Sequence, residues 1–231
     1  MKKLKQIIFI LSIAILLIPF SSVLAHRPLW GEQYGPIEIP NLSTSFAVYR
    51  DLTPDQIDVF TFEAKAGQEL HAGIQIPAVN GLRGYGVTVA LFGPGLPEAD
   101  PNALPPDHPD DLGAMIFPSR VTEDFFEPFT QTNYWGRQEI DFNLPSAGTY
   151  YLLVWQPDGK AGKYVLDTGR AEVFGPGDLF RFPIWWVRVH IFFGHGPWLA
   201  LAAALILLAV GLLVIRKRYR KKHFRKSIQN D

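Results

Sequence analysis

The sequence predicts an all-β protein, an antiparallel β-sandwich outside the membrane followed by one C-terminal transmembrane helix. Three observations predict this class. Between residues 26 and 178, short runs of alternating apolar and polar residues are separated by glycine- and proline-rich turns. No stretch of comparable length there shows helical periodicity. One uncharged stretch near the C-terminus is long enough to cross a bilayer. Short strands without intervening helices favour a sandwich over a parallel α/β enzyme fold.

The amino terminus has the pattern of a secretory signal. Lys2, Lys3 and Lys5 precede an apolar segment over residues 7–20, and small residues lead to a signal-peptidase site after Ala25. We therefore expect residues 1–25 to be a cleaved signal peptide, the alternative being an uncleaved anchor. Cleavage would make His26 the first residue of the mature chain.

The strands of the sandwich are expected at residues 59–64, 70–76, 87–91, 140–144, 150–155 and 164–167. Alternation places Phe60 and Phe62 together on one face of the first strand. Residues 150–155 are an uninterrupted apolar run, which indicates a strand buried on both faces. The turn at residues 157–160, with sequence Pro-Asp-Gly-Lys, separates that strand from the last one.

Residues 94–135 interrupt this rhythm and are predicted to be a long insertion. Residues 94–111 hold six prolines and five acidic residues, so we expect an exposed excursion between strands. Residues 117–135 continue it with several aromatic side chains. Because long insertions carry function more often than strand faces do, this insertion is the preferred place for a binding surface.

The strand sequences resemble those of the bacterial pre-peptidase C-terminal domain family. The motifs are DQIDVFTFEAKAGQELHAGI at residues 55–74, GVTVALFGPG at 86–95 and DFNLPSAGTYYLLVWQPDGKAGKYVLDTG at 141–169. The resemblance implies a small jelly-roll-like β-sandwich. The length of residues 26–178 suits a single extracytoplasmic domain. The resemblance also implies a non-catalytic accessory or binding module. The long insertion departs from the family pattern.

Residues 179–196 form a predicted aromatic segment before the membrane. Aromatic rings favour the head-group level of a bilayer, so this segment is expected to lie along the outer interface or to form a short helix there. Residues 194–197, Gly-His-Gly-Pro, should break any helix. The residues expected at the membrane interface are Trp185, Trp186, Arg188, His190, Phe192, Phe193, His195 and Trp198.

The predicted transmembrane helix covers residues 197–215, which carry no charge and span about 28 Å as a helix. Residues 216–231 form a basic tail that fixes the C-terminus on the cytoplasmic side. Positive-inside anchoring alone explains this tail, and binding of anionic lipid head groups is the sharper alternative. The residues assigned to that alternative are Arg216, Lys217, Arg218, Arg220, Lys221 and Lys222.

Charge and composition exclude several functions for the outer part. Residues 26–196 hold 11 basic and 21 acidic residues, a net charge of −10, which argues against nucleic acid as a ligand. The chain has no cysteine, hence no disulfide and no thiolate chemistry. Neither a G-x-S-x-G elbow nor an H-E-x-x-H motif occurs. We therefore expect no enzymatic activity and no obligatory cofactor.

Metal binding is the alternative function. A mature chain that begins at His26 offers an amine and an imidazole for copper, with His71 or His108 as a further ligand. Calcium is a second option, through the acidic side chains of Asp100, Asp107, Asp110 and Asp111, although their spacing matches no EF-hand. The favoured hypothesis is a membrane-anchored binding module for an envelope protein or carbohydrate.

Overall fold

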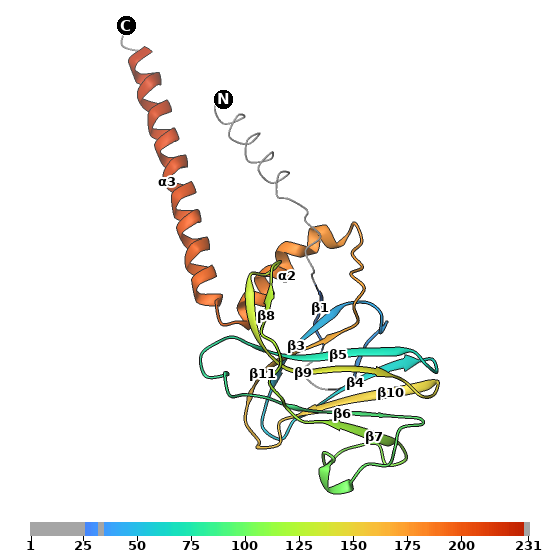
Figure 1. Ribbon diagram of the computed structural model, residues 1–231. Helices are drawn as coiled ribbons and strands as arrows, with labels where there is room; N and C mark the ends of the chain where they lie inside the picture. The colour runs from blue at the N-terminus through green and yellow to red at the C-terminus, as the bar shows by residue number, and fades with distance from the viewer. Residues whose placement is uncertain (1–25, 32–34, 229–231) are drawn as a thin grey trace. The chain divides into compact units, whose positions relative to one another are not determined.

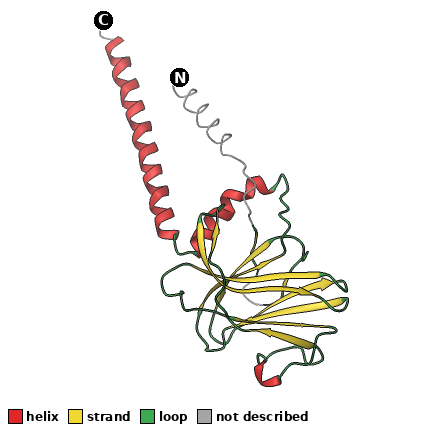
Figure 2. Cartoon of the chain, viewed as in Figure 1, coloured by secondary structure: helices red, strands yellow, loops and turns green. Residues whose placement is uncertain are grey.

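The computed structural model, which describes residues 26–31 and 35–228, contains two β-sheets followed by two helices (Figure 1). The chain divides into two compact units, one up to Phe174 and one from Gly175. In the first unit, strands and loops form the two sheets, as Figure 2 shows. The all-β sandwich expected from the sequence is therefore confirmed.

One sheet has six strands and the other has five. The six-stranded sheet has, in spatial order, β1 (Arg27–Leu29), β3 (Phe46–Leu52), β11 (Gly162–Thr168), β5 (Glu69–Pro77), β9 (Thr132–Asn143) and β8 (Phe125–Glu127). The five-stranded sheet has β2 (Ile37–Glu38), β4 (Ile57–Ala64), β10 (Gly148–Trp155), β6 (Thr88–Gly93) and β7 (Gly113–Phe117). Pairings between these described strands are antiparallel, apart from the short edge strands β1 and β2, which pair in parallel with β3 and β4.

The core lies between the two sheets and contains the residues that alternation predicted. Phe60 and Phe62 of β4 are buried, and so are the inward residues of β5, namely Leu70, Ala72, Ile74 and Ile76. The apolar strand β10 is covered on both faces: Leu152 faces the main core, and on the opposite face Leu104 and Leu112 of the predicted insertion pack against a second apolar cluster. The outward residue Leu153 of β10 belongs to this smaller cluster, with Ala90 and Phe92.

The sequence did not predict strands β1, β2 and β3. β1 and β2 have three and two residues, too few for a periodic pattern. β3 contains Arg50 and Asp51, whose charges break an apolar pattern, yet Arg50 is only 5% exposed. A buried partner compensates this charge: Asp58 of β4 accepts hydrogen bonds from Arg50 Nε at 2.9 Å and Nη2 at 2.6 Å.

The predicted insertion, residues 94–135, is partly loop and partly sheet. Its first part contains the single-turn helix η1 (Pro101–Ala103) and otherwise no strand until Gly113. The remainder supplies β7, β8 and the first residues of β9. The insertion therefore extends both sheets: β7 forms the edge of the five-stranded sheet, and β8 that of the six-stranded sheet.

The second unit contains α2 (Asp178–Phe192) and α3 (Gly196–Ile228). Asp178, in the first turn of α2, accepts a hydrogen bond from the backbone N–H of Gly175 at 2.8 Å, which closes the turn that leads into the helix. The break between the helices falls at Gly194, whose φ of 81° is accessible to glycine at little cost. Within α3, residues Gly196–Lys217 are long and apolar enough to cross a membrane.

Candidate functional site

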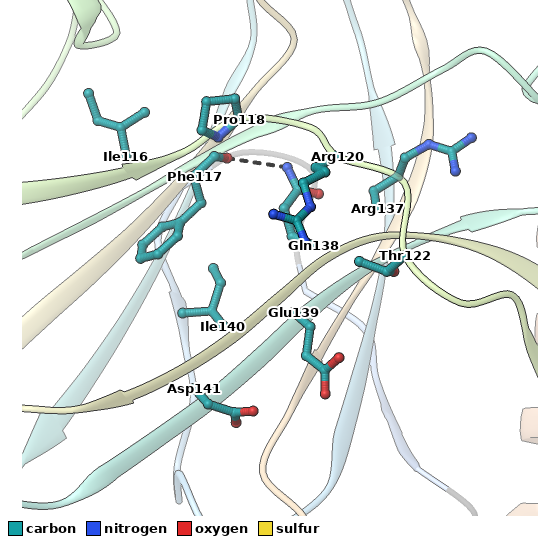
Figure 3. Close-up of a pocket in the computed structure, with 10 residues that line it drawn as sticks. All are labelled: Ile116, Phe117, Pro118, Arg120, Thr122, Arg137, Gln138, Glu139, Ile140 and Asp141. Carbon is teal, nitrogen blue, oxygen red and sulfur yellow. Dashed lines mark hydrogen bonds between the residues drawn. The ribbon is translucent and has the colours of Figure 1, made fainter.

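A groove of about 630 Å³ lies at one open side of the sandwich, where β7 and the C-terminal half of β9 are both edge segments (Figure 3). Figure 3 shows the side chains that line it: Ile116, Phe117, Pro118, Arg120, Thr122, Arg137, Gln138, Glu139, Ile140 and Asp141. The groove therefore combines residues of the predicted insertion with residues of a central-sheet strand.

The backbone of β9 presents hydrogen-bonding groups to this groove. His71 of β5 lies opposite Asp141, and its carbonyl accepts a hydrogen bond from Gly169 on the other side of β5. In an antiparallel ladder, the N–H and C=O of a residue point to the same side of the strand. His71 uses this side to bond to Gly169, so His71 and Asp141 form a non-hydrogen-bonded pair. The N–H and C=O of Asp141, and of Glu139 two residues earlier, consequently point away from β5 and toward the groove.

A loop between β7 and β8 closes one end of the groove. Backbone N–H groups of Arg120 and Thr122 donate to the carbonyls of Arg137 and Gly136, at 3.0 and 3.1 Å. The side-chain amide of Gln138 donates to the carbonyl of Phe117 at 3.3 Å and so ties β9 to β7 (Figure 3). These contacts occupy the β9 edge only as far as Arg137.

The two arginines of the groove have different roles. The Arg137 guanidinium donates to the backbone carbonyls of Tyr85 and Gly136, each at 2.9 Å, and to that of Arg83. Burial lowers the pKa of Arg137, although the nearby Asp124 opposes this shift. Arg137 is thus a structural clamp. Arg120 and Glu139 are exposed and, within the described part of the chain, form no ion pair, so both charges are available to a ligand.

His71, Glu139 and Asp141 form a cluster beside the groove, with one potential metal-ligating atom each, all within 4.8 Å of one another. His71 Nδ1 lies 2.7 Å from Asp141 Oδ1, and Arg170 donates to the same oxygen at 2.8 Å. Burial acts to raise the pKa of Asp141, but His71 and Arg170 outweigh it and leave the pKa lowered. Asp141 is therefore already charge-paired, and a cation would have to displace Arg170.

His26 lies in a second pocket, a cavity of about 10 Å³, which holds roughly one water molecule. The residues that line it are His26, Ala47, Tyr49, Gln75, Phe125, Glu127, Tyr134, Val165 and Asp167. His26 Nδ1 lies 3.5 Å from Glu127 Oε2. Gln75 Oε1 and Asp167 Oδ1 are buried acceptors without a hydrogen-bond donor. Asp167 fits over Gly73 because a side chain there would collide with its carboxylate.

The surroundings of His26 favour its protonated form. Burial acts to lower the pKa of the imidazole, but the hydrogen bond with Glu127 and the charges of Asp167, Glu127 and Glu172 outweigh it, so the pKa is raised. A divalent cation would take the place of that proton, because neutral imidazole and carboxylate oxygens are its ligands. The pocket therefore has cation-binding chemistry.

The structure does not bring the three predicted histidine ligands together. His71 belongs to the six-stranded sheet, whereas the ring of His108 stacks on Phe92 of the five-stranded sheet at 5.8 Å. Each of His26 and His71 instead has carboxylate neighbours.

The predicted calcium ligands Asp100, Asp107, Asp110 and Asp111 are all exposed. Among the residues that the structure describes, they do not converge into a set of ligand atoms. Asp100 has a local role, since its side chain accepts a hydrogen bond from the Asn102 N–H at 3.0 Å at the start of η1.

The predicted interface residues lie in the second unit. Trp185, Trp186, Arg188, His190 and Phe192 are in α2, Phe193 and His195 follow it, and Trp198 is in the first turn of α3. His190 and His195 approach each other, with their Nδ1 atoms 2.8 Å apart. Of the basic tail, Arg216 and Lys217 are exposed, whereas the side chains of Arg218, Arg220, Lys221 and Lys222 lie outside the described residues, as does the predicted signal peptide.

Arg120, Arg137 and Glu139 were not predicted as functional residues. One signal for Glu139 exists in the sequence: it alternates with Asp141 around the core residue Ile140, which indicates two carboxylates on one strand face. That this edge of the strand is unpaired follows only from the topology.

Comparisons with known proteins find no match among protein-family models or curated proteins. Among solved structures, the chain is similar to PliG of Salmonella Typhimurium, a periplasmic inhibitor of g-type lysozyme, with 19% identity over 58% of this chain and 96% of that chain, and a TM-score of 0.34. The pre-peptidase C-terminal domain of a Bacillus anthracis collagenase gives 18% identity over 59% and 96%, with a TM-score of 0.33.

A third similar structure is CorA of Methylomicrobium album BG8, a surface-associated copper-binding protein, with 10% identity over 59% of this chain and 98% of that chain, and a TM-score of 0.32. The family that the strand motifs resemble is thus among the similar structures. At these TM-scores the similarities do not identify a ligand for this chain.

Proposed function

We propose that this protein is a non-catalytic binding module that α3 holds at the outer face of the cytoplasmic membrane, with the groove between β7 and β9 as its binding surface. The groove is the observation that carries this proposal. Its volume of about 630 Å³ is within the usual range of ligand sites, about 300–1,000 Å³. Apolar side chains of β7 line one part of it, and the exposed charged side chains of Arg120 and Glu139 line another. A segment of an envelope protein or a carbohydrate fits this mixture.

The residues of the groove favour binding over catalysis. Of the residues that line it, none is a serine, cysteine or histidine, so a nucleophile and its base are not paired there. Asp141 is held by His71 and Arg170, and Arg137 is held by backbone carbonyls. The groups that remain, Arg120 and Glu139, can orient a ligand by charge.

Two features of the second unit support the membrane anchor. Gly196–Lys217 is a 22-residue apolar helix, about 33 Å long. In α2, the side chains of Phe180, Ile184, Val187 and Ile191 are all at least 41% exposed. Their spacing of three and four residues places them on one face of the helix. An exposed apolar face just before a membrane span is typical of a helix that lies in the interface.

Cysteine labelling tests this topology, since the natural chain has no cysteine. We expect a membrane-impermeant maleimide to label Glu98→Cys in intact spheroplasts, because Glu98 is exposed in the sandwich. Ser227→Cys in the basic tail should be labelled only after lysis. Labelling of Ser227→Cys before lysis would show that the orientation is inverted.

Site-specific crosslinking tests the binding surface. Replacing Ile116, in the groove, with the photocrosslinker p-benzoylphenylalanine should give a defined adduct in native cells. The matched control is the same replacement at Val59, which lies on the outer face of the five-stranded sheet. The adduct at Ile116 should disappear when Arg120 and Glu139 are both replaced by alanine. Equal adducts at both positions, or none at Ile116, would exclude the groove as the binding surface.

Copper binding through His26 is a second candidate, favoured by the carboxylates around its imidazole. The mature amino terminus would add an amine ligand. Amino-terminal sequencing should give His26 as the first residue, and Cu²⁺ titration should give one tight site. Glu127→Gln should weaken that site, whereas His108→Ala, on the other sheet, should not change it. A mature chain that begins elsewhere, or the lack of a tight site, would rule out this candidate.

A further inference from the structure

The edge of β9 in the groove is open for hydrogen bonding. In the described part of the chain, β9 pairs with β5 on one side, and on its other side β8 reaches only as far as Tyr134. The contacts of the loop extend this pairing to Arg137. Beyond it, the N–H and C=O of Glu139 and Asp141 point into the groove with no strand opposite them.

The chain's own loop already donates hydrogen bonds to this edge. The N–H groups of Arg120 and Thr122 bond to the carbonyls of Arg137 and Gly136, which are adjacent in β9 where its register with β5 shifts. Pro118 ends this pairing because it has no N–H to donate. Beyond Arg137, the backbone groups on this edge of β9 are therefore available to a segment from another chain.

The two faces of this edge differ in chemistry. Toward the core, Met115, Phe117 and Phe142 are only partly buried and pack at the margin of the main apolar cluster. Toward solvent, Glu139 presents an unpaired carboxylate. A strand added here would place alternate side chains on these two faces, so apolar residues would face the core margin and the residues between them would face Glu139.

The negative charge of the outer part favours a positively charged ligand side chain on the solvent side of the added strand. Residues 26–196 carry a net charge of −10, and the exposed carboxylates of Glu139 and Asp141 are among the residues that line the groove (Figure 3). A cationic side chain beside Glu139 is attracted by both the local and the overall charge.

We propose that the groove binds an extended peptide segment as an additional strand on β9, with apolar side chains toward the core and a lysine or arginine beside Glu139. This inference rests on the proposed binding function and names its ligand class. The repeated N–H and C=O groups of β9 recur every two residues, about 7 Å apart, which matches a peptide backbone. A carbohydrate has no such repeat of donors and acceptors.

The test uses the full-length chain in detergent and a fluorescein-labelled nonapeptide in which lysine and valine alternate. Fluorescence anisotropy should show saturable binding, and a peptide of the same composition with its lysines and valines in separate blocks should bind at least tenfold more weakly. Two N-methylated forms of the alternating peptide should differ, one methylated at every lysine nitrogen of the backbone and the other at every valine nitrogen. One form should not bind and the other should bind as before, because only one of the two sets of N–H groups faces β9.

Two substitutions of Glu139 distinguish the contribution of its side-chain charge to binding from that of its backbone N–H. Glu139→Ala should weaken binding about two- to fivefold, since it removes one exposed charge pair. Glu139→Pro should weaken it a further three- to tenfold, because it also removes the outward N–H while an edge strand tolerates proline. Glu98→Ala, an exposed carboxylate elsewhere, should have no effect. Unchanged thermal unfolding would confirm that each variant is folded.

The outcomes also distinguish this inference from the proposed function. Equal binding of the alternating and block peptides, or equal affinities of Glu139→Ala and Glu139→Pro, would overturn strand addition. If crosslinking at Ile116 still gave a defined adduct, the groove would remain a binding surface with another ligand, such as a carbohydrate. If neither the adduct at Ile116 nor peptide binding were observed, both the proposed binding surface and strand addition would be excluded.

Discussion

Asp58→Asn tests the buried charge network that joins the two sheets. The Asp58 carboxylate accepts hydrogen bonds from Arg50 Nε and Nη2 at 2.9 and 2.6 Å, from the Tyr164 hydroxyl at 2.6 Å and from Gln56 Nε2 at 2.7 Å. Asp58 is 3% exposed. Asparagine would replace one acceptor oxygen with an NH₂ donor, which would then face donors, and it would remove the carboxylate charge to which Arg50 is bonded.

The expected loss in the free energy of unfolding is about 3–5 kcal/mol, the usual cost of breaking a buried ion pair by removing one partner. An independent estimate agrees. A hydrogen bond to a charged group contributes about 1.5–3 kcal/mol, and at least two of the four bonds to Asp58 would be lost or inverted. The hydrogen bond with Asp58 raises the pKa of Arg50, so the guanidinium stays charged at neutral pH. A loss of this size is a large part of the stability of a domain.

Guanidinium denaturation of the chain in detergent, followed by far-ultraviolet circular dichroism, measures this loss. The double variant Arg50→Met/Asp58→Leu is the control, because it replaces the pair with apolar groups and leaves no buried charge. It should recover most of the stability lost in Asp58→Asn. If Asp58→Asn costs less than about 1 kcal/mol, or if the double variant is no more stable than the single one, the network does not act as a buried ion pair.

Three further predictions concern the core and the tyrosine and histidine pKa values. Phe60→Ala should cost about 3–5 kcal/mol in the same denaturation assay, and Trp155→Ala, half-buried on the outer face of its sheet, clearly less. Burial raises the pKa of Tyr134 to about 12, so the stability it contributes should be complete below pH 10 and fall by a few kcal/mol as the pH rises toward 12; Tyr134→Phe should reduce that loss in thermal unfolding scans. Glu127→Gln should lower the pKa of His26, measured by NMR titration, and an unchanged value would contradict the assigned contact.

The sequence predicted those strands in which local pattern and tertiary environment agree. Phe60 and Phe62 alternate because one face of β4 meets the core, and β10 is continuously apolar because its two faces contribute to two different apolar clusters. β3 was missed because Arg50 interrupts its pattern. The partner that makes this arginine tolerable, Asp58, lies on another strand, and a pattern within one strand carries no information about it.

The candidate sites were harder to predict for a related reason. His26 was singled out from its place after the signal, but Glu127 and Asp167 reach it from strands about 100 and 140 residues away. The groove likewise joins Ile116 of one sheet to Glu139 of the other. The sequence did indicate residues 94–135 as the location of a binding surface, and they supply half of the groove. The other half depends on which edge of β9 stays unpaired, which is a property of the whole topology.

An open sheet edge carries a risk of self-association that this groove has to manage. If β9 paired with the same strand of a second copy, carboxylates of Glu139 and Asp141 from both chains would be brought onto one face. Like charges on directly opposed strands are destabilising. The Glu139 carboxylate, which has no ion-pair partner in the described part of the chain, also attracts a cationic strand, so this side chain both disfavours pairing between copies and selects a basic ligand. Glu139→Lys should therefore weaken binding of the lysine–valine peptide and, in a mixture with the unmodified chain, promote association between the two, which analytical ultracentrifugation in detergent would detect.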